Sequence, residues 1–384
     1  QMAEFVAKPA QYNGTVDSET GIIHGQGKMV YSDGSSYDGT FVKGRRDGKG
    51  THVTIEADGK ESKYSGDWVD NTIQGRGVAT FSNGNVYEGD FSKGKIEGEG
   101  TLTTLMGDKY EGSWRAEKMH GHGIYHYADG DTYIGEWQND KRHGVGKVSY
   151  CDETGEITES YDGDWKFGKM HGRGKYTHKD KSIYEGEWVE GKMEGWGKFN
   201  FANGNVYDGN WENDVKAGFG TLSYASGERY EGQWKNDMAN GEGTLIYANQ
   251  DTYKGMWVDD KKHGRGELHY VNGNVYKGEW KDDMADGEGT LTYSNGDVYE
   301  GQWKNNLRDG NGKFVCAKDG YIYDGSWAQG CKNGIGSITM PSTKDVFKGE
   351  FRDGRLVGPK LSDGSLVWAF AEDSDWANVD SNAF

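Results

Sequence analysis

"YEGQWKNDMANGEG" occupies Tyr230–Gly243, and "YKGEWKDDMADGEG" occupies Tyr276–Gly289, 46 residues further along the chain. The two stretches share an opening Tyr-x-Gly-x-Trp, six intervening residues and a closing Gly-x-Gly. Aligning the whole chain on the opening aromatic residue gives fifteen copies, mostly 23 residues apart, from Tyr12 to Phe347. A fixed period of this length indicates a repeat array, in which each unit buries its apolar side chains only against its neighbours.

The aromatic and glycine positions alternate with polar ones at the start of each repeat. In Tyr230–Lys235, the residues Glu231 and Gln233 separate Tyr, Gly and Trp, so an extended chain places the two kinds on opposite faces. A glycine that recurs in register within a strand marks a close approach to the backbone. We therefore predict two short strands per repeat, with the Tyr and Trp rings lying across the glycines of the adjacent strand. Both closing glycines are expected to serve this packing.

Two kinds of turn should join these strands. Lys235–Asn240 is expected to reverse the chain within a repeat, and Asn-Gly or Asp-Gly pairs, as in residues 81–84 and 127–130, are expected to form tight hairpins between repeats. Insertions before Tyr64 and Tyr161 contain turn sequences of their own. We expect these two hairpins to protrude from one edge of the array.

Composition narrows the class of protein. Only 33% of residues are hydrophobic while 13% are aromatic, and 63 glycines accompany 3 prolines, which favours a thin, repetitive β-structure over a large aliphatic core. The net charge of −18 argues against a general binder of nucleic acid or anionic lipid. The short basic clusters Lys43/Arg45/Arg46 and Lys179/Lys181 are interpreted as solvated loop charges.

Cysteine use and apolar runs indicate the compartment. Cys151, Cys316 and Cys331 are too few and too irregularly spaced for a disulfide framework. The first eleven residues lack the apolar core of a signal peptide, and the longest apolar run, Leu366–Ala371, is far shorter than a membrane span. We expect a soluble, cytoplasmic protein.

The pattern "YEGEW…GKMEGWGKF" at Tyr184–Phe199 resembles the MORN (membrane occupation and recognition nexus) repeat. The resemblance implies an all-β, elongated, single-layer antiparallel sheet of tandem hairpins, a rod or curled ribbon. It divides the chain into an N-terminal segment (1–11), an array of about fifteen repeats (12–359) and an acidic, aromatic tail (360–384). Pro359 is expected to end the array, because proline cannot donate to a sheet ladder.

The family also implies scaffolding roles, in basal cytoskeletal complexes of protists, radial-spoke heads of cilia, junctophilins at membrane junctions and plant phosphatidylinositol-phosphate kinases. In the last two, another domain is attached to the repeats. This sequence contains no such domain, so neither kinase activity nor a membrane anchor is transferred to it.

No reaction chemistry is predicted. The closing Gly-x-Gly recurs fourteen times without a following helical pattern, whereas a phosphate-binding glycine loop occurs once, before a helix. The close spacing of His120, His122 and His126 suggests metal ligands. However, histidine precedes the same repeat glycine in other copies, so a preference for histidine at this turn is the favoured explanation. Repeated carboxylates are interpreted as solvent-facing and unpaired: Glu88, Glu111, Glu185, Glu231 and Glu300. We predict no catalytic, cofactor-binding or metal-binding residue and no cofactor.

The leading hypothesis is therefore a non-catalytic scaffold of a cytoskeletal assembly, ciliary or basal, that binds several proteins along the sheet edges and a concave aromatic surface. Expected partners are proteins and a second copy of the chain, with no nucleic acid. The alternative is a phospholipid-associated adaptor, which the charge disfavours; a regulatory array of an enzyme ranks third. Aromatic residues outside the repeat register are the candidate partner-binding residues: Trp368, Phe370, Trp376 and Trp196. The tail that carries the first three is expected to cap the last hairpin, to dock on a partner, or both.

Overall fold

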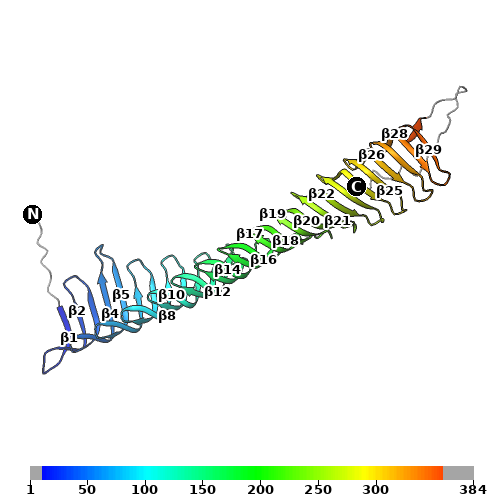
Figure 1. Cartoon of the computed structure of the whole chain (residues 1–384). Coiled ribbons are helices and arrows are strands. Elements are labelled where there is room, and N and C mark those ends of the chain that lie inside the picture. The colour runs from blue at the N-terminus through cyan, green and yellow to red at the C-terminus, as the bar shows by residue number, and fades with distance from the viewer. Residues whose placement is uncertain (1–10, 358–384) are drawn as a thin grey trace, which may run out of the picture. The chain divides into compact units, whose positions relative to one another are not determined.

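The structure is a computed structural model that describes residues 11–357. The chain divides into two compact units, residues 1–192 and 193–384. The described residues form thirty strands and no helix, which confirms the all-β prediction. Within each unit, every strand pairs antiparallel with the next strand along the chain, and the sheet stays open instead of closing into a barrel (Figure 1).

The strands of the first unit are β1 (Gln11–Val16), β2 (Ile23–Val30), β3 (Ser36–Val42), β4 (Arg45–Ile55), β5 (Glu61–Val69), β6 (Thr72–Thr80), β7 (Val86–Ser92), β8 (Lys95–Thr103), β9 (Lys109–Arg115), β10 (Lys118–His126), β11 (Thr132–Gln138), β12 (Lys141–Cys151), β13 (Ile157–Lys166), β14 (Lys169–Thr177) and β15 (Ile183–Val189).

The remaining strands are β16 (Lys192–Asn200), β17 (Val206–Glu212), β18 (Val215–Ser223), β19 (Arg229–Lys235), β20 (Met238–Ile246), β21 (Thr252–Val258), β22 (Lys261–His269), β23 (Val275–Lys281), β24 (Met284–Thr292), β25 (Val298–Lys304), β26 (Leu307–Val315), β27 (Ile322–Ala328), β28 (Cys331–Met340), β29 (Asp345–Arg352) and β30 (Arg355–Val357).

A ladder of aromatic rings forms the core of each unit. The Tyr230 ring meets Trp234 of its own repeat edge-on at 5.0 Å between centroids, and meets Trp257 of the next repeat at 5.3 Å. Both Tyr230 and Trp234 are buried. Edge-to-face pairs of this kind contribute about 0.5–1.5 kcal/mol each beyond the area they bury. The ladder therefore supplies, within a single sheet, the packing that a second layer would otherwise provide.

Glycines allow the rings to reach the backbone, as predicted. Gly232 on β19 lies opposite Gly243 on β20. A Cβ atom on Gly232 would come within 2.6 Å of the Tyr230 hydroxyl and 2.5 Å of the Gly243 Cα atom. The Tyr230 hydroxyl donates across this bare stretch to the carbonyl oxygen of Gln233 at 3.0 Å. No side chain fits between the ring and the strand at this point.

The first glycine of the Gly-x-Gly pair has a different role from the one expected. The pairing of β19 with β20 shifts register between Gly232 and Trp234, so β20 bulges around Gly241. Gly241 has a φ of +101°, a conformation that side-chain-bearing residues rarely adopt. The prediction that a ring requires this glycine is wrong, because the backbone of the bulge requires it.

The two kinds of turn are also exchanged relative to the prediction. Asn236 and Asp237 alone join β19 to β20, and their φ angles of 50° and 67° correspond to a tight two-residue hairpin turn of type I′. Between repeats, the loop is longer: the Phe81 N–H donates to the Asn85 carbonyl oxygen at 2.9 Å, and Gly84 inside it has a φ of +87°. The tight turns thus lie within the repeats, where the sequence analysis expected a longer reversal.

Side chains in the turns tie each repeat to its neighbour at both edges of the sheet. At the tight turns, the Asp237 carboxylate accepts a hydrogen bond of 2.8 Å from the Lys216 N–H of the preceding repeat. At the longer loops, the Asn205 side chain accepts one of 3.0 Å from the Ala225 N–H of the following loop. These bonds satisfy the backbone N–H of Lys216 just after a tight turn and that of Ala225 within a loop.

The two insertions lengthen strand pairs and form hairpins of their own, which were predicted to protrude from one edge of the array. β4 and β12 each have 11 residues, and the hairpins β4–β5 and β12–β13 turn at residues 56–60 and 152–156. The β4–β5 hairpin rises above its neighbours in Figure 1. The prediction of a rod concerns the whole chain and stays a prediction, since each unit is described by itself here.

Candidate functional site

The aromatic face is closed to partners in the part of the chain that the structure describes. From Tyr37 onward, the lead tyrosines are at most 5% exposed, and the tryptophans of the repeat at most 6%. The rings contact one another and the glycine backbone instead of solvent. The expectation of an open, concave aromatic surface is therefore wrong: a single sheet needs these rings as its core.

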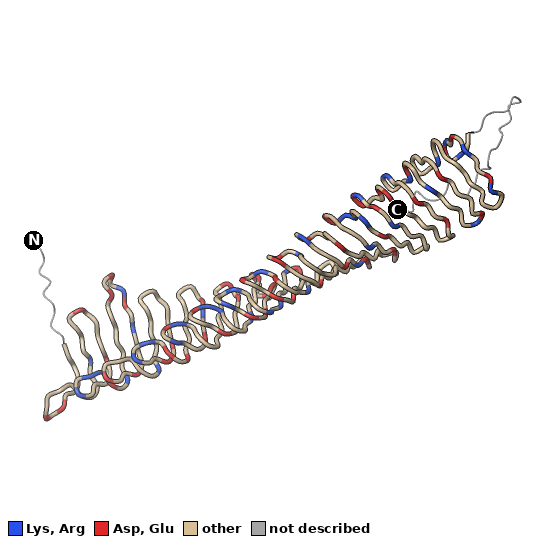
Figure 2. The backbone as a smooth tube through the Cα atoms, in the orientation of Figure 1, with Lys and Arg blue, Asp and Glu red and all other residues tan. Residues whose placement is uncertain are grey.

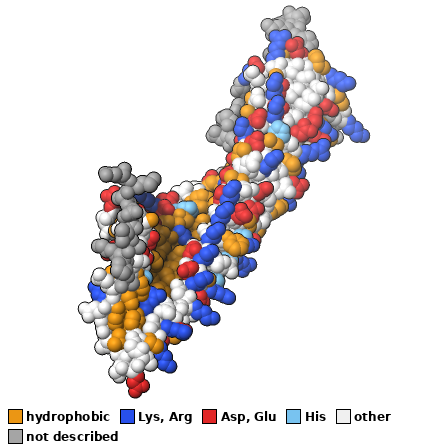
Figure 3. All heavy atoms as spheres, turned by 90° about the vertical axis from the view of Figure 1, so that its left-hand side faces the viewer, with side chains coloured by type: hydrophobic (Ala, Val, Ile, Leu, Met, Phe, Trp, Pro, Cys, Tyr) orange, Lys and Arg blue, Asp and Glu red, His pale blue; other side chains and the backbone are white. Residues whose placement is uncertain are grey.

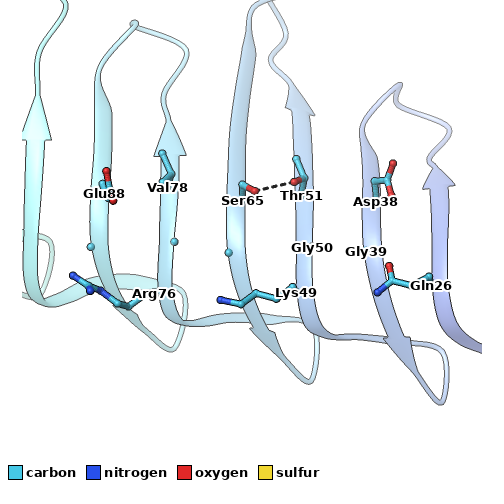
Figure 4. A pocket seen from close by; sticks show the side chains of 13 residues that line it. Gln26, Asp38, Gly39, Lys49, Gly50, Thr51, Ser65, Arg76, Val78 and Glu88 are labelled. Atoms are coloured by element: carbon cyan, nitrogen blue, oxygen red, sulfur yellow. Dashed lines mark hydrogen bonds between the residues drawn. The ribbon is translucent and has the colours of Figure 1, made fainter.

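The opposite face carries the accessible grooves. Two rows of side chains line this polar face: the first row holds the middle residue of each Gly-x-Gly and its cross-strand partner, and the second row holds the residue after Gly-x-Gly and its partner. In the first unit, a groove of about 570 Å³ follows these rows. Figure 4 shows its first row, Gln26, Lys49 and Arg76, below its second row, Asp38, Thr51, Ser65, Val78 and Glu88.

Charges in the first unit's groove neutralise one another locally. Lys49 forms an ion pair of 2.6 Å with Asp67, and Arg76 one of 3.5 Å with Asp90. The Thr51 and Ser65 hydroxyls are hydrogen-bonded at 2.9 Å (Figure 4). Such exposed pairs contribute about 0–1 kcal/mol each to stability. Because both basic side chains that line this groove are paired, they offer little free positive charge to an anionic ligand.

The second unit has the larger groove, about 1150 Å³ in volume, over β18–β25. Charges alternate across the strands at the centre of its second row, where Lys254 and Lys277 both lie in register with Glu267. Lys277 contacts Glu267 at 3.0 Å. Although burial opposes the shift, hydrogen bonds from Lys277 and His269 lower the pKa of Glu267. Figure 2 shows acidic and basic positions alternating along much of the backbone, and Figure 3 shows a row of basic side chains beside acidic ones on the face in view.

Exposed apolar side chains interrupt the first row of this second unit. Phe219 and Met256 line the groove and are 55% and 39% exposed. Trp196, singled out from the sequence because it lies outside the repeat register, occupies the same row on β16 and is 52% exposed. The sequence analysis missed Phe219 and Met256, although both stand at polar positions of the repeat. The other candidate residues, Trp368, Phe370 and Trp376, lie outside the described residues.

Basic side chains cover several rings, which sequence reasoning also missed. The Lys216 ammonium lies 4.3 Å from the Trp234 ring centre, the Lys262 ammonium 4.4 Å from Trp280, and the Arg46 guanidinium 4.3 Å from Trp68. Burial lowers the pKa of Lys216 and of Lys262. These cations complete the core through cation–π contacts and are not available to an anionic ligand.

The basic cluster near the N-terminal end is only partly a set of loop charges. Lys43 is an exposed turn residue, but Arg45 is ion-paired with Asp70, and Arg46 is half-buried over Trp68. The interpretation of all three as solvated loop charges is therefore wrong for Arg46. Lys179 and Lys181 are exposed, as expected.

The residues considered for chemistry are dispersed. Among residues 11–357, no group of three or more His, Cys, Asp and Glu side chains is arranged to hold a metal ion. His126 lies 3.9 Å from the Glu111 carboxylate, whereas the Nδ1 atom of His120 is buried with no hydrogen-bond partner in the described region. Glu111 pairs with Lys109, whose hydrogen bond lowers the pKa of Glu111, and Glu231 pairs with Arg229 at 2.8 Å. The expectation that the repeated carboxylates are unpaired is thus wrong for Glu111 and Glu231.

Residues 11–357 contain no helix that is long and apolar enough to cross a membrane. The three cysteines are free: Cys151 is partly buried, Cys316 buried and Cys331 exposed.

A comparison with models of known protein families finds the same repeats as the spacing of aromatic residues and glycines. The model of the MORN repeat family matches fourteen stretches, residues 21–36, 37–53, 64–86, 87–109, 110–132, 133–154, 161–183, 184–206, 207–229, 230–252, 253–275, 276–298, 299–321 and 323–342. The last repeat identified from the sequence, at Phe347, lies beyond these matches, although β29 and β30 form a hairpin there.

Relatives and solved structures match more distantly. Alsin from Rattus norvegicus is 37% identical over 78 residues, which are 20% of this chain and 5% of Alsin. Alsin from Homo sapiens is 32% identical over 83 residues, 21% of this chain and 5% of Alsin. This chain thus spans about a twentieth of the length of these relatives. The TCP10 domain of Danio rerio CPAP, solved with a peptide of Danio rerio STIL, is 16% identical with a TM-score of 0.31, covering 61% of this chain and 94% of that chain.

Proposed function

The chain belongs to the MORN repeat family, and we propose that it is a non-catalytic scaffold that binds segments of other proteins along its polar grooves. The observation that carries this proposal is the groove of the second unit. Its walls combine locally paired charges with the exposed apolar side chains of Phe219 and Met256. An apolar anchor within a polar, charge-balanced surround is typical of protein–protein interfaces.

The repetition of the groove supports a scaffold over a single-ligand binder. A second groove runs along the first unit, with different side chains on the same backbone framework. Because each repeat position can vary without changing the ring ladder, separate stretches of one array can suit separate partners. We propose the assembly to be cytoskeletal, ciliary or basal, and the location cytoplasmic; the resemblance to scaffolding members of the family supports this part.

The alternative of a phospholipid adaptor has less support. An anionic membrane surface attracts free Lys and Arg side chains, each worth about 1 kcal/mol near the surface. In the grooves, Lys49, Arg76 and Lys277 are paired with carboxylates, and Lys216 and Lys262 cover rings. A lipid-binding array would need these cations to be free.

A capture experiment with matched variants tests the proposal. The full chain is tagged in its native cell as wild type, as Trp196→Ala/Phe219→Ala and as Ile335→Ala, and the captured proteins are quantified by mass spectrometry. Ile335 is a suitable control because it occupies the same repeat position as Trp196 and is 72% exposed. We expect a defined set of proteins to be lost only with the double variant, while circular dichroism shows all three folded. Retention of the same set by all three variants contradicts the proposal.

A parallel experiment addresses lipid. Sedimentation with vesicles containing anionic phosphoinositides is compared for wild type and for Lys43→Glu/Arg45→Glu, which leaves the Arg46–Trp68 contact intact. We expect neither protein to sediment with the vesicles at physiological salt. Salt-sensitive sedimentation that the charge reversal abolishes favours the adaptor.

A further inference from the structure

Trp196 and Phe219 occupy the same position of two successive repeats. Trp196 lies on β16, Phe219 lies on β18, and β17 separates them. Both point to the polar face and are more than half exposed, at 52% and 55%. With strands about 4.8 Å apart, the two side chains are about 9.6 Å apart along the first row.

Amide side chains stand between and beyond the two rings. Asn210 lies in register with Trp196, and Gln233 lies in register with Phe219. The Gln233 Oε1 atom accepts a hydrogen bond of 3.0 Å from the Glu242 N–H, which leaves its NH₂ group to donate elsewhere. The Asn210 side chain makes no hydrogen bond within residues 11–357. Aromatic rings and side-chain amides therefore alternate along the row, and each amide has an NH₂ group that can donate a hydrogen bond.

We propose that this row binds a basic, proline-rich segment of a partner in the polyproline II conformation, an inference that rests on the proposed function and names the partner's chemistry. Polyproline II rises about 3.1 Å per residue with three residues per turn, so prolines three positions apart are about 9.3 Å apart. This repeat matches the separation of Trp196 and Phe219. Proline rings dock on exposed aromatic side chains in other grooves of this kind.

The amides favour this occupant over an α-helix. A polyproline II backbone has no internal hydrogen bonds, so its carbonyl oxygens need donors such as the NH₂ groups of Asn210 and Gln233. A helix satisfies its own backbone and would meet the row with an apolar stripe. If the first apolar residue of the helix lay on Trp196, the apolar residue three or four positions later would lie over the polar Asn210 side chain, which is an unfavourable contact.

Charge complementarity indicates a basic flank on the partner. Beyond Phe219, the first row continues with Glu242 on β20, which is exposed and has no ion pair within the described region. Glu279 and Glu288 follow along the first row, in which Arg265 is the basic residue, and the groove as a whole is lined by six Glu against four Lys or Arg. A Lys or Arg about one polyproline turn after the second proline therefore lies near Glu242. The segment runs with its prolines over β16–β18 and its basic residues over β20–β24.

Binding of two synthetic probes tests this assignment. One labelled peptide carries proline at every third position followed by arginines; the other has alanine in place of each proline and the same charge. We expect fluorescence anisotropy to detect binding of the proline peptide to the full chain. That binding should weaken about tenfold with Trp196→Ala or with Phe219→Ala, the loss typical of an aromatic anchor, and stay unchanged with Ile335→Ala.

A substitution at the amide separates the two bound conformations. Asn210→Leu removes a hydrogen-bond donor and adds apolar surface. It should therefore weaken binding of the proline peptide and strengthen binding of a helical peptide. If the alanine peptide binds wild type as tightly as the proline peptide, or if Asn210→Leu strengthens the proline peptide, the assignment is wrong. Failure of both peptides, with capture of native partners still dependent on Trp196 and Phe219, overturns this assignment alone. Failure of both peptides together with capture that ignores Trp196 and Phe219 overturns the proposed function as well.

Discussion

The indole nitrogen of Trp234 donates a hydrogen bond of 3.1 Å to the carbonyl oxygen of Gly220, which belongs to the preceding repeat. The same bond recurs from Trp211 to Gly197 at 3.1 Å and from Trp257 to Gly243 at 3.3 Å. Because the acceptor glycine lies beside the Tyr ring of its own repeat, this bond joins two successive layers of the core. The tryptophans thus connect repeats, and their rings are not available as a binding surface.

Two substitutions of Trp234 should separate the contribution of the ring to the free energy of unfolding from that of the hydrogen bond. Trp234→Phe keeps most of the ring but loses the N–H, and should lower the free energy of unfolding by about 1–2 kcal/mol. Trp234→Ala should cost about 3–5 kcal/mol through the cavity it leaves. Phe41, Phe91 and Phe351 show that the array accommodates phenylalanine at this position. Equal losses in urea denaturation would mean that the hydrogen bond, and not the ring, stabilises the junction.

The two closing glycines of one repeat should respond differently to alanine. At Gly243, the new Cβ would overlap the Tyr230 ring, which has nowhere to move in a packed ladder. At Gly241, the main cost is the φ of +101°, because the atom nearest the new Cβ is the far end of the flexible Gln233 side chain. Gly227 is the matched control, because it has the same φ of +101° and open space around its Cβ position.

We expect Gly227→Ala to cost about 1–2 kcal/mol, the price of a left-handed residue. Gly243→Ala should cost about 1–3 kcal/mol from overpacking and should also displace the Tyr230 ring, which Gly227→Ala leaves in place. Thermal unfolding followed by near-ultraviolet circular dichroism measures both effects. If Gly243→Ala is as mild as a surface substitution, the ring does not lie on this backbone.

The half-buried lysines over the rings should limit stability at neutral pH. Burial lowers the pKa of Lys262 below its ordinary value of 10.5, so the folded protein binds this proton less tightly than the unfolded chain. Lys262→Met keeps the apolar stem over Trp280 and removes the charge. It should raise the unfolding midpoint at neutral pH, and its advantage should shrink as the pH rises through the lowered pKa toward 10.5.

Lys261→Met, at an exposed neighbouring position, is the control and should change the midpoint little. A lower midpoint for Lys262→Met would show that the cation–π contact, worth about 0.5–2 kcal/mol, exceeds the cost of burying the ammonium group.

The lead tyrosines should make the fold sensitive to alkali. Burial raises the pKa of Tyr37, Tyr64 and Tyr323 from 10.0 to about 12, and raises the pKa of other lead tyrosines as well. The folded state thus holds these protons more tightly than the unfolded chain. The resulting stability is complete below pH 10 and is lost as the pH rises from 10 through about 12.

Phenolate absorbance and far-ultraviolet circular dichroism, recorded together against pH, check this prediction. We expect the lead tyrosines to ionise in the same transition as unfolding. Ionisation of all tyrosines near their ordinary pKa, with the sheet still folded, would mean that the rings are accessible to water.

Much of the backbone plan could be predicted from the repeat itself. The period, the two strands per repeat, the alternation of Tyr230 and Trp234 with polar residues, and the contact of rings with glycine all follow from spacing. The tight turn was also readable, because several repeats carry glycine at its second position, as at Gly44 and Gly94. The Asn-Gly and Asp-Gly pairs of the longer loops predicted tight hairpins there instead, since such pairs favour two-residue turns.

Other features depend on three-dimensional packing. Lys216 and Lys262 lie in register with Trp211 and Trp257 on the ring face, although their polarity alone suggests surface charges. The groove could not be read from spacing either, because it forms on the face whose residues vary most between repeats. Trp196 was found as an exception to the pattern; Phe219 and Met256 needed the structure to reveal that they share its row.

Photo-crosslinking in the native cell tests most directly whether the polar face binds partners. A photoreactive amino acid is placed at Thr244, inside the second unit's groove, and in a separate chain at Val258, which is exposed and not among the residues lining that groove. We expect crosslinks from Thr244 to defined segments of partner proteins, and their loss when Trp196 and Phe219 are replaced by alanine. Equal crosslinking from Thr244 and Val258, or crosslinks from Thr244 that persist without the two aromatic side chains, would contradict the account.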